Sequence, residues 1–184
     1  MTTAWNSVRA YAEHAYPENA GLLQPIPVDL ERPTNRGHID QVDAWFEREV
    51  PTKAPGRQHR ILVIEGDTGT GKTADARSRG THSRMGNVWN VAALSSEADI
   101  WILDDMVHTN GRYSLKALSQ YECDFTGRYK HVKSMKVRPT VILGNSREAI
   151  TKCWSDIEGE EGEAWVKGNV DWVYSGGRPF FVFP

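Results

Sequence analysis

A glycine-rich stretch at residues 66–73 has the residue types and the spacing of a phosphate-binding loop. Gly66, Gly71, Lys72 and Thr73 fit the pattern G-x-x-x-x-G-K-[ST]. Glycine tolerates positive φ, so the backbone can curl and point its N–H groups inward, and the start of the next helix adds a positive dipole end. Such a cup suits a triphosphate, with the lysine on the β- and γ-phosphates and the threonine hydroxyl on Mg²⁺. We expect the whole loop to bind the nucleotide: Gly66, Asp67, Thr68, Gly69, Thr70, Gly71, Lys72, Thr73 and Ala74.

Two adjacent aspartates end a second apolar run. Residues 100–103 lead into Asp104 and Asp105. Ligands bind at the carboxyl ends of the strands in open α/β sheets, so these carboxylates are typical of a Walker B element. We expect Asp104 to hold Mg²⁺ through water and Asp105 to polarise the attacking water. The alternative is a strand that simply ends in solvated aspartates.

A third apolar run, at residues 140–143, is followed by Gly144 and Asn145. An amide at the end of a strand beside the phosphate loop can orient the attacking water, and we assign this sensor role to Asn145. The alternative is that Asn145 is a helix N-cap or a turn residue before Ser146.

Elements must bring these three groups together. Apolar runs alternate with helical patterns from residue 60, which predicts an α/β fold with a mostly parallel central sheet flanked by helices. The predicted strands are 61–65, 87–91, 99–104, 140–143, 172–174 and 180–183, and the predicted helices are 71–79, 113–122 and 146–154. A polar hairpin is expected at 129–138 and an acidic, glycine-rich loop at 155–163.

The first 59 residues differ from the rest. Apolar stripes predict helices at 1–16 and 38–50, separated by proline-containing linkers at 17–37 and 51–59. We therefore expect a small helical segment, 1–59, ahead of a nucleotide-binding domain, 60–184.

Composition restricts the possible partners. The net charge is −2, so any contact with nucleic acid must come from a local basic patch. Cys123 and Cys153 offer neither a disulfide framework nor metal-ligand spacing, which is typical of an intracellular protein with reduced thiols. No apolar run reaches the roughly 18 residues of a membrane span, and the N-terminus is too polar for a signal peptide. We expect no membrane partner.

The order of the motifs resembles superfamily 3 helicases. GDTGTGKT, DIWILDDM, a basic hairpin and TVILGNS follow one another as in the ATPase domain of replication initiator (Rep) proteins from circular single-stranded DNA viruses and related plasmids. That family carries a middle segment like "DRYP…V…KG", for which this chain offers Asp124, Gly127, Arg128, Tyr129, Val132 and Lys133. The resemblance covers residues 60–150.

The resemblance implies an AAA+-like P-loop ATPase that binds ATP and Mg²⁺ and hydrolyses ATP. Its catalytic residues would be Lys72, Asp104, Asp105 and Asn145, and its metal ligands Thr73 and Asp104. It also implies a homo-oligomeric ring, expected to be a hexamer, with single-stranded DNA in the channel and the N-terminal helices as an oligomerisation collar. The protein would act in the host nucleus if it comes from a eukaryotic DNA virus, and otherwise in the cytoplasm.

We expect the basic hairpin to contact the single-stranded DNA. Its cationic residues form the densest basic stretch of the chain, and a lysine there can neutralise a phosphate without reading sequence. The resemblance assigns this contact to Lys133, with Lys130 and Lys136 as further candidates. The alternative is a solvated hairpin face.

Some residues depart from the family pattern. Asp67 stands where the family often has proline, and Gly144 where it usually has serine. The family's arginine finger has no clear counterpart, and the candidates are Arg147, Lys167 and Arg178. No His-x-His pair of a nicking domain occurs, so we interpret the Tyr-x-x-Lys match at residues 113–116 as a coincidence.

Three other functions stay open at this stage. An RNA-directed viral superfamily 3 ATPase would carry the same motifs, because nothing in the hairpin separates RNA from DNA. A small-molecule kinase on a P-loop scaffold would need no arginine from a neighbour. A nucleotide-binding assembly module with little turnover is the third.

Overall fold

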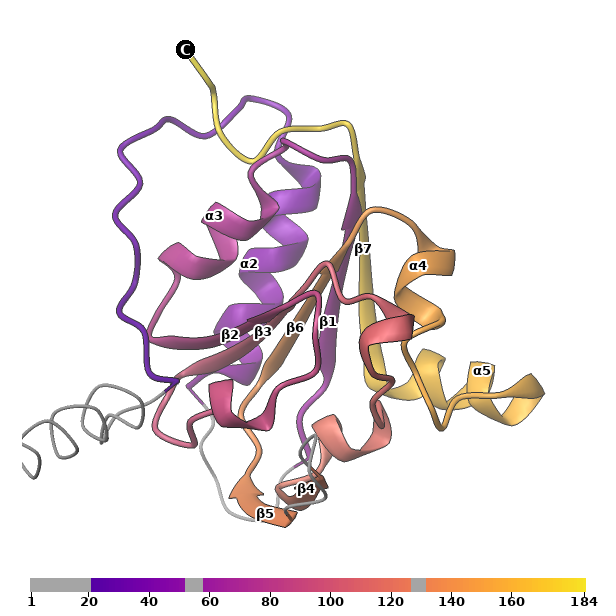
Figure 1. Cartoon of the computed structure of the whole chain (residues 1–184). Helices are drawn as coiled ribbons and strands as arrows, with labels where there is room; N and C mark the ends of the chain where they lie inside the picture. The colour runs from indigo at the N-terminus through magenta and orange to yellow at the C-terminus, as the bar shows by residue number, and fades with distance from the viewer. Residues whose placement is uncertain (1–20, 52–57, 127–131) are drawn as a thin grey trace, which may run out of the picture.

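Five parallel strands form the centre of the protein, which we describe from a computed structural model covering residues 21–51, 58–126 and 132–184 (Figure 1). The strand order is β2-β3-β6-β1-β7, and every neighbouring pair is parallel. The strands are β1 (Ile61–Gly66), β2 (His82–Gly86), β3 (Ile100–Asp104), β6 (Thr140–Gly144) and β7 (Val170–Gly176). The predicted α/β class with a mostly parallel central sheet is confirmed.

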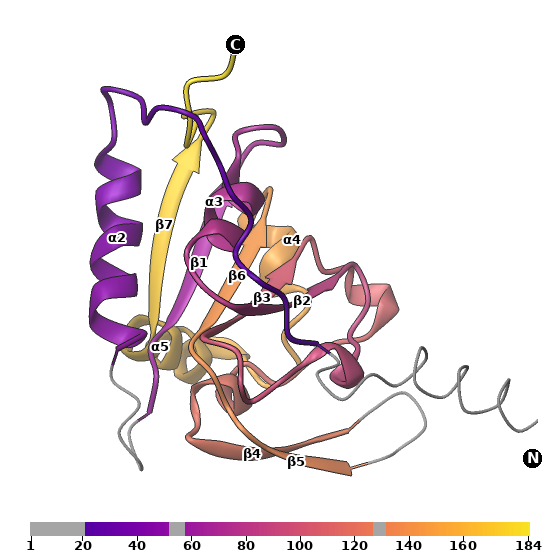
Figure 2. The ribbon, with the colours of Figure 1, turned by 90° about the vertical axis from the view of Figure 1, so that its left-hand side faces the viewer.

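Helices cover both faces of this sheet (Figure 2). They are α2 (Gly37–Glu49), α3 (Lys72–Ser78), α4 (Arg147–Thr151) and α5 (Gly159–Asn169). A separate two-stranded antiparallel hairpin consists of β4 (Glu122–Thr126) and β5 (Val132–Lys136). In both views this hairpin lies at the end of the sheet opposite the β1–α3 loop.

Alternation along the strands divides the core into two layers, because successive side chains of a strand point to opposite faces. Leu62 and Ile64 pack with α2 and α3, whereas Ile61 and Val63 pack with α4 and the hairpin. Both sets are fully buried, which explains why the run at 61–64 is continuously apolar and not alternating.

Helix α2 packs against the sheet. Ile39, Val42 and Trp45 are buried in the same cluster as β1, and the Trp45 indole donates to the Arg60 carbonyl. The predicted helix at 38–50 is thereby confirmed within one residue. The predicted helix at 1–16 lies outside the described residues, and the oligomerisation role of 1–59 stays a prediction.

Four predicted elements are wrong. The strand expected at 87–91 is instead β2 at His82–Gly86, because Asn87 adopts a positive φ of 64° and turns the chain. The helix expected at 113–122 is only a 3₁₀ turn at Lys116–Ser119, because the Asp156 carboxylate binds the N–H groups of Leu115 and Lys116.

The other two lie near the C-terminus. The loop expected at 155–163 contains the start of α5, whose first-turn glutamates, Glu160 and Glu161, suit the positive end of a helix. The strand expected at 180–183 is an extended segment outside the sheet, where the Phe180 N–H donates to Thr70 and the Val182 N–H to Glu31. The hairpin expected at 129–138 begins earlier, at Glu122, and residues 127–131 lie outside the described part.

Candidate functional site

The loop between β1 and α3 curls as the motif predicts. Gly69 and Gly71 have φ values of 81° and 91°, in the left-handed region that favours glycine. The loop forms one wall of a pocket of roughly 380 Å³ at the carboxyl end of the sheet. The residues that line it are Thr68, Gly69, Gly71, Lys72, Thr73, Ala74, Asp104, Asp105, Asn145 and Phe183.

Lys72 fills the centre of this loop. Its ammonium group donates to the carbonyl oxygens of Gly66 at 2.8 Å and Asp67 at 2.7 Å, and its side chain is buried. Burial lowers the pKa of Lys72, while the charges of Asp105, Asp104 and Asp67 act in the opposite direction. The lysine is thus held by backbone dipoles that a phosphate could replace.

The loop and the end of β3 meet directly. The Thr73 hydroxyl donates to Asp104 Oδ2 at 3.0 Å, which joins the first turn of α3 to the end of β3. Asp104 is almost fully buried, so its charge needs partners. A second partner is Arg84 of β2, which donates to the same oxygen from Nε and Nη2.

These groups fit a magnesium ion. Hydroxyl and carboxylate oxygens are the hard ligands that Mg²⁺ takes, and it completes its shell with water and phosphate oxygens. No group of three histidine, cysteine or acidic residues within the described ranges could hold a metal ion on its own. Thr73 and Asp104 would therefore hold the ion together with the phosphates, and the ion would neutralise the charge that develops on them.

Asp105, the residue after Asp104, has a left-handed backbone conformation. Its φ is 47°, and its N–H donates to the Leu143 carbonyl at 3.1 Å, which ties it to β6. Partial removal from water raises the pKa of Asp105, as does the neighbouring charge of Asp104. A carboxylate in this state can accept a proton or a hydrogen bond from water.

Asn145 does not cap the helix that follows it. The cap of α4 is Ser146, whose hydroxyl accepts the Ala149 N–H at 3.2 Å. The N-cap alternative for Asn145 is therefore wrong, whereas the turn alternative stays open because Asn145 lies at a bend. Asn145 lines the same pocket as Lys72 and Asp105. The structure thus brings the predicted catalytic residues together: Lys72, Asp104, Asp105 and Asn145.

A second set of hydrogen bonds forms around Glu65, at the end of β1 where the loop begins. Glu65, the last residue before Gly66, accepts the Arg147 N–H at 2.9 Å and the Trp172 indole N–H at 2.9 Å. The start of α4 and the edge strand β7 are thereby tied to β1. The Arg147 guanidinium stacks over the Trp172 ring at 4.1 Å.

The three candidates for the arginine finger differ in how they are held. Arg147 is stacked on its own chain, and Arg178 donates to the carbonyls of Tyr174 and Ser175. Lys167 is exposed on α5. Within the described residues, Lys167 is therefore the candidate whose side chain is not engaged in a hydrogen bond, ion pair or stacking contact.

The hairpin lysines point in different directions. Lys133 shares a face with Met135, which packs into the core, and its ammonium group lies 3.5 Å from the Leu94 carbonyl. Lys136 is on the opposite face, paired across the hairpin with Glu122. Both are exposed. Lys130 lies outside the described residues.

The C-terminal segment covers the phosphate loop, which the sequence did not indicate. The Phe180 N–H donates to the Thr70 carbonyl at 2.8 Å, and the Phe181 and Phe183 rings pack over Gly71. Figure 1 shows this segment, in yellow, crossing the β1–α3 loop. The aromatic run was visible in the sequence, but its place beside the loop depends on where β7 ends.

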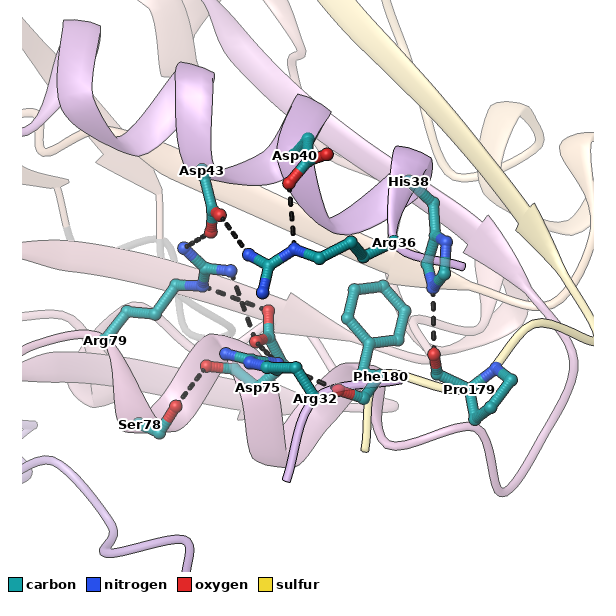
Figure 3. Close-up of polar contacts among 10 residues, drawn as sticks. All are labelled: Arg32, Arg36, His38, Asp40, Asp43, Asp75, Ser78, Arg79, Pro179 and Phe180. Carbon is teal, nitrogen blue, oxygen red and sulfur yellow. Dashed lines mark hydrogen bonds and ion pairs between the residues drawn. The ribbon is translucent and has the colours of Figure 1, made fainter. Parts of the chain in front are cut away.

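A cluster of ion pairs joins α3 to α2, to the segment before α2 and to the C-terminal segment (Figure 3). Asp75 of α3 is fully buried and pairs with Arg32 at 2.7 Å and with Arg79 at 3.0 Å. Arg32 also donates to the Phe180 carbonyl, and Arg79 reaches Asp43 of α2. The helix after the loop, α2 and the C-terminal segment are thus held together.

The chain matches several curated proteins, among them three viral replication-associated proteins. The replication-associated protein of Cabbage leaf curl virus (isolate Jamaica) is 26% identical over 181 residues, which is 92% of this chain and 51% of the relative. Those of Chloris striate mosaic virus and Panicum streak virus (isolate Kenya) are 30% and 32% identical, over 70% and 59% of this chain. The chain is similar to viral replication-associated proteins.

This similarity supports the Rep-like relationship predicted from the motif order. The chain spans about a third to a half of the length of these relatives, with shares of 51%, 36% and 32%. No family model matches the chain. In the described ranges, no helix is both long enough and apolar enough to cross a membrane.

Proposed function

We propose that this chain is the ATPase domain of a viral replication-associated protein, which binds ATP with Mg²⁺ and uses its hydrolysis to move along single-stranded DNA. The observation that carries the proposal is the hydrogen bond between the Thr73 hydroxyl and Asp104 Oδ2 at 3.0 Å. It joins the two motifs that a P-loop ATPase uses to hold Mg²⁺ on the β- and γ-phosphates. The names of the relatives support the replication context.

The chemistry follows from the pocket. An arriving triphosphate replaces the carbonyls of Gly66 and Asp67 as the partner of the Lys72 ammonium, because a phosphate carries full negative charge. Asp105 and Asn145 line the same pocket at the ends of β3 and β6. Asp105 accepts a hydrogen bond from the attacking water, and Asn145 orients that water.

Movement of the strand is assigned to the hairpin. Lys133 is exposed on β5 at the end of the fold opposite the ATP pocket, and Lys130 and Lys136 flank it in sequence. In a ring, expected to be a hexamer, these lysines would contact the phosphates of a strand in the channel. Lys167 is the candidate that would complete a neighbour's site.

The test is steady-state ATP hydrolysis by the purified chain, without polymer, with single-stranded DNA and with single-stranded RNA. Lys72→Ala is expected to lower turnover by about a hundredfold or more, because it removes a charge aimed at the transferred phosphate. Lys152→Ala, which removes an exposed lysine that pairs with Glu148, is the matched control and should keep wild-type turnover. Equal turnover in Lys72→Ala and the wild type would contradict the proposal.

The comparison of single-stranded DNA with single-stranded RNA shows which polymer the protein acts on. Stimulation by DNA above RNA supports the proposal, and Lys133→Ala should then lower the stimulation more than Lys116→Ala. Stimulation by RNA above DNA would assign the chain to RNA-directed ATPases. Light scattering with ATP present tests the ring, and a monomer that turns over ATP without regard to polymer would favour a small-molecule kinase.

A further inference from the structure

A second hollow adjoins the phosphate pocket. It has a volume of roughly 250 Å³ and lies between the segment before α2 and the end of the chain. Phe183 lines both this hollow and the phosphate pocket, so the two spaces meet at its ring. The residues that line the hollow are Asp29, Leu30, Glu31, Val182, Phe183 and Pro184.

The walls of this hollow are fixed in place. The Val182 N–H donates to the Glu31 carbonyl at 2.8 Å, which joins the two segments. Arg32 donates to the Phe180 carbonyl at 3.0 Å and stacks over the Phe181 ring at 4.5 Å. The segment that carries Phe183 is therefore anchored to the phosphate loop and to the buried Asp75.

Three large apolar side chains line the hollow. Leu30, Val182 and Phe183 are all exposed large hydrophobic residues, and 48% of the Phe183 surface is open to solvent. Exposed apolar groups that gather beside a polar pocket mark a binding site. The volume is below the roughly 300–1,000 Å³ of pockets that enclose a drug-sized ligand, so it suits one planar ring system and not a whole nucleotide.

The proposed roles of the pocket residues determine how the nucleotide is oriented in the pocket. Asp105 and Asn145 act on the terminal phosphate, and they line the side of the phosphate pocket that adjoins β3 and β6. We therefore expect the base to lie away from these two residues; Ala74 and Phe183 line the phosphate pocket but not the hollow beside Asp105. A neighbouring hollow of roughly 330 Å³ beside Asp105 lies on the terminal-phosphate side and is therefore excluded as the place of the base.

We infer that this hollow is the seat of the nucleobase, with the purine stacked on Phe183. The inference rests on the proposed function and adds to it a residue for base recognition. Stacking on an aromatic face stabilises any base. Asp29 and Glu31 line the same hollow, and their carboxylates have no hydrogen-bond or ion-pair partner within the described residues. Ionised carboxylates only accept hydrogen bonds, so they favour a purine that carries an amino group.

The experiment compares ADP with inorganic pyrophosphate, which shares the phosphate group but has no base. Dissociation constants are measured by calorimetry on the full chain with Mg²⁺. Phe183→Ala should raise the dissociation constant of ADP about tenfold and leave that of pyrophosphate unchanged, whereas Phe183→Trp should keep both near wild type. Tyr174→Ala, which removes an exposed aromatic residue from β7 that lines neither space, is the matched control.

The outcomes distinguish a failure of the proposed nucleobase site from a failure of the proposed phosphate site. If Phe183→Ala leaves ADP binding unchanged, or weakens ADP and pyrophosphate equally, the nucleobase seat is overturned. Lys72→Ala should weaken both ligands, and if it weakens neither, the proposed function itself fails. Thermal unfolding of Phe183→Ala shows whether the variant is folded, as expected for a half-exposed side chain.

The two carboxylates have their own test. The wild type should bind ADP about fivefold more tightly than purine riboside diphosphate, which lacks the amino group. The double variant Asp29→Ala, Glu31→Ala should bind the two ligands equally. Equal binding by the wild type would contradict the role of these carboxylates and leave stacking on Phe183 to be judged from the first comparison.

Discussion

The Arg84 guanidinium donates from both Nε and Nη2 to one carboxylate oxygen of Asp104, at 3.1 and 2.8 Å. The same oxygen accepts the Thr73 hydroxyl. The pairing of β2 with β3 makes this possible, because Arg84 lies opposite Ile102 and side chains two residues apart on a strand share a face. A fixed positive charge thus stands beside the carboxylate that is proposed to bind Mg²⁺.

Replacing this arginine should strengthen metal binding by the nucleotide-free protein. In Arg84→Gln the guanidinium no longer repels the incoming cation, and we expect the affinity for Mn²⁺, used as a paramagnetic substitute for Mg²⁺, to rise about tenfold. Electron paramagnetic resonance of free Mn²⁺ measures it. Arg112→Gln, which removes an arginine bonded to the carbonyls of Lys152 and Trp154, should have no effect. Weaker binding by Arg84→Gln would mean that Arg84 supports the metal site.

Two glycines of the loop should respond differently to alanine. Both Gly69 and Gly71 have positive φ, so either substitution costs about 1 kcal/mol of backbone strain. A Cβ on Gly69 would meet nothing within 4 Å, but one on Gly71 would lie 3.0 Å from the Phe181 ring and 3.1 Å from that of Phe183. Gly71→Ala should therefore lose about 2–3 kcal/mol in the free energy of unfolding, measured in urea. Equal losses would show that the C-terminal segment moves aside freely.

The part of the site that the sequence predicts is the part carried by continuous apolar strands. β1, β3 and β6 are buried on both faces, so their runs are visible without knowledge of their neighbours. β3 ends in Asp104, while Lys72 and Asn145 follow the ends of β1 and β6. Parallel pairing then brings these three residues to one edge of the sheet.

The part that could not be predicted depends on tertiary pairing. β2 reads HSRMG, a polar edge strand with no apolar run, and without its register Arg84 has no visible link to Asp104. Phe183 reaches the loop only because the chain turns back after β7 at Gly176, which has a φ of 56°. The acidic start of α5 suggested a loop, because glycine and glutamate gave no apolar stripe.

Removing the buried carboxylate of Asp75 should destabilise the fold. Asp75→Asn leaves Arg32 and Arg79 without their negative partner, and because both arginines retain some contact with water we expect a loss of about 2–3 kcal/mol in the free energy of unfolding. Asp40→Asn is the matched control (Figure 3), since Asp40 forms an exposed pair with Arg36 and should leave stability almost unchanged. Urea denaturation measures the free energy of unfolding of both variants. Equal values for Asp75→Asn and Asp40→Asn would contradict a stabilising role of the buried Asp75 carboxylate.

Two buried histidines should make the protein less stable in mild acid. Burial lowers the pKa of His38 and of His82 from 6.5; Arg178 also opposes the charge of His38, and Asp75 and Asp40 favour it. His38 donates from Nε2 to the Pro179 carbonyl, and its buried Nδ1 has no hydrogen-bond partner in the described structure. His82 accepts the Arg77 Nε–H, so its ring is neutral as well.

The direction of the effect follows from these lowered pKa values. The unfolded chain takes up protons on both histidines below pH 6.5 while the folded chain resists, so the free energy of unfolding falls as the pH drops through and below 6.5. Urea unfolding between pH 7.5 and 5.5 should show this decline, and His38→Gln should make it shallower. His108→Gln, which removes an exposed histidine, should keep the wild-type slope. A wild-type stability that is constant over this range would show that both rings are protonated without cost in the folded protein.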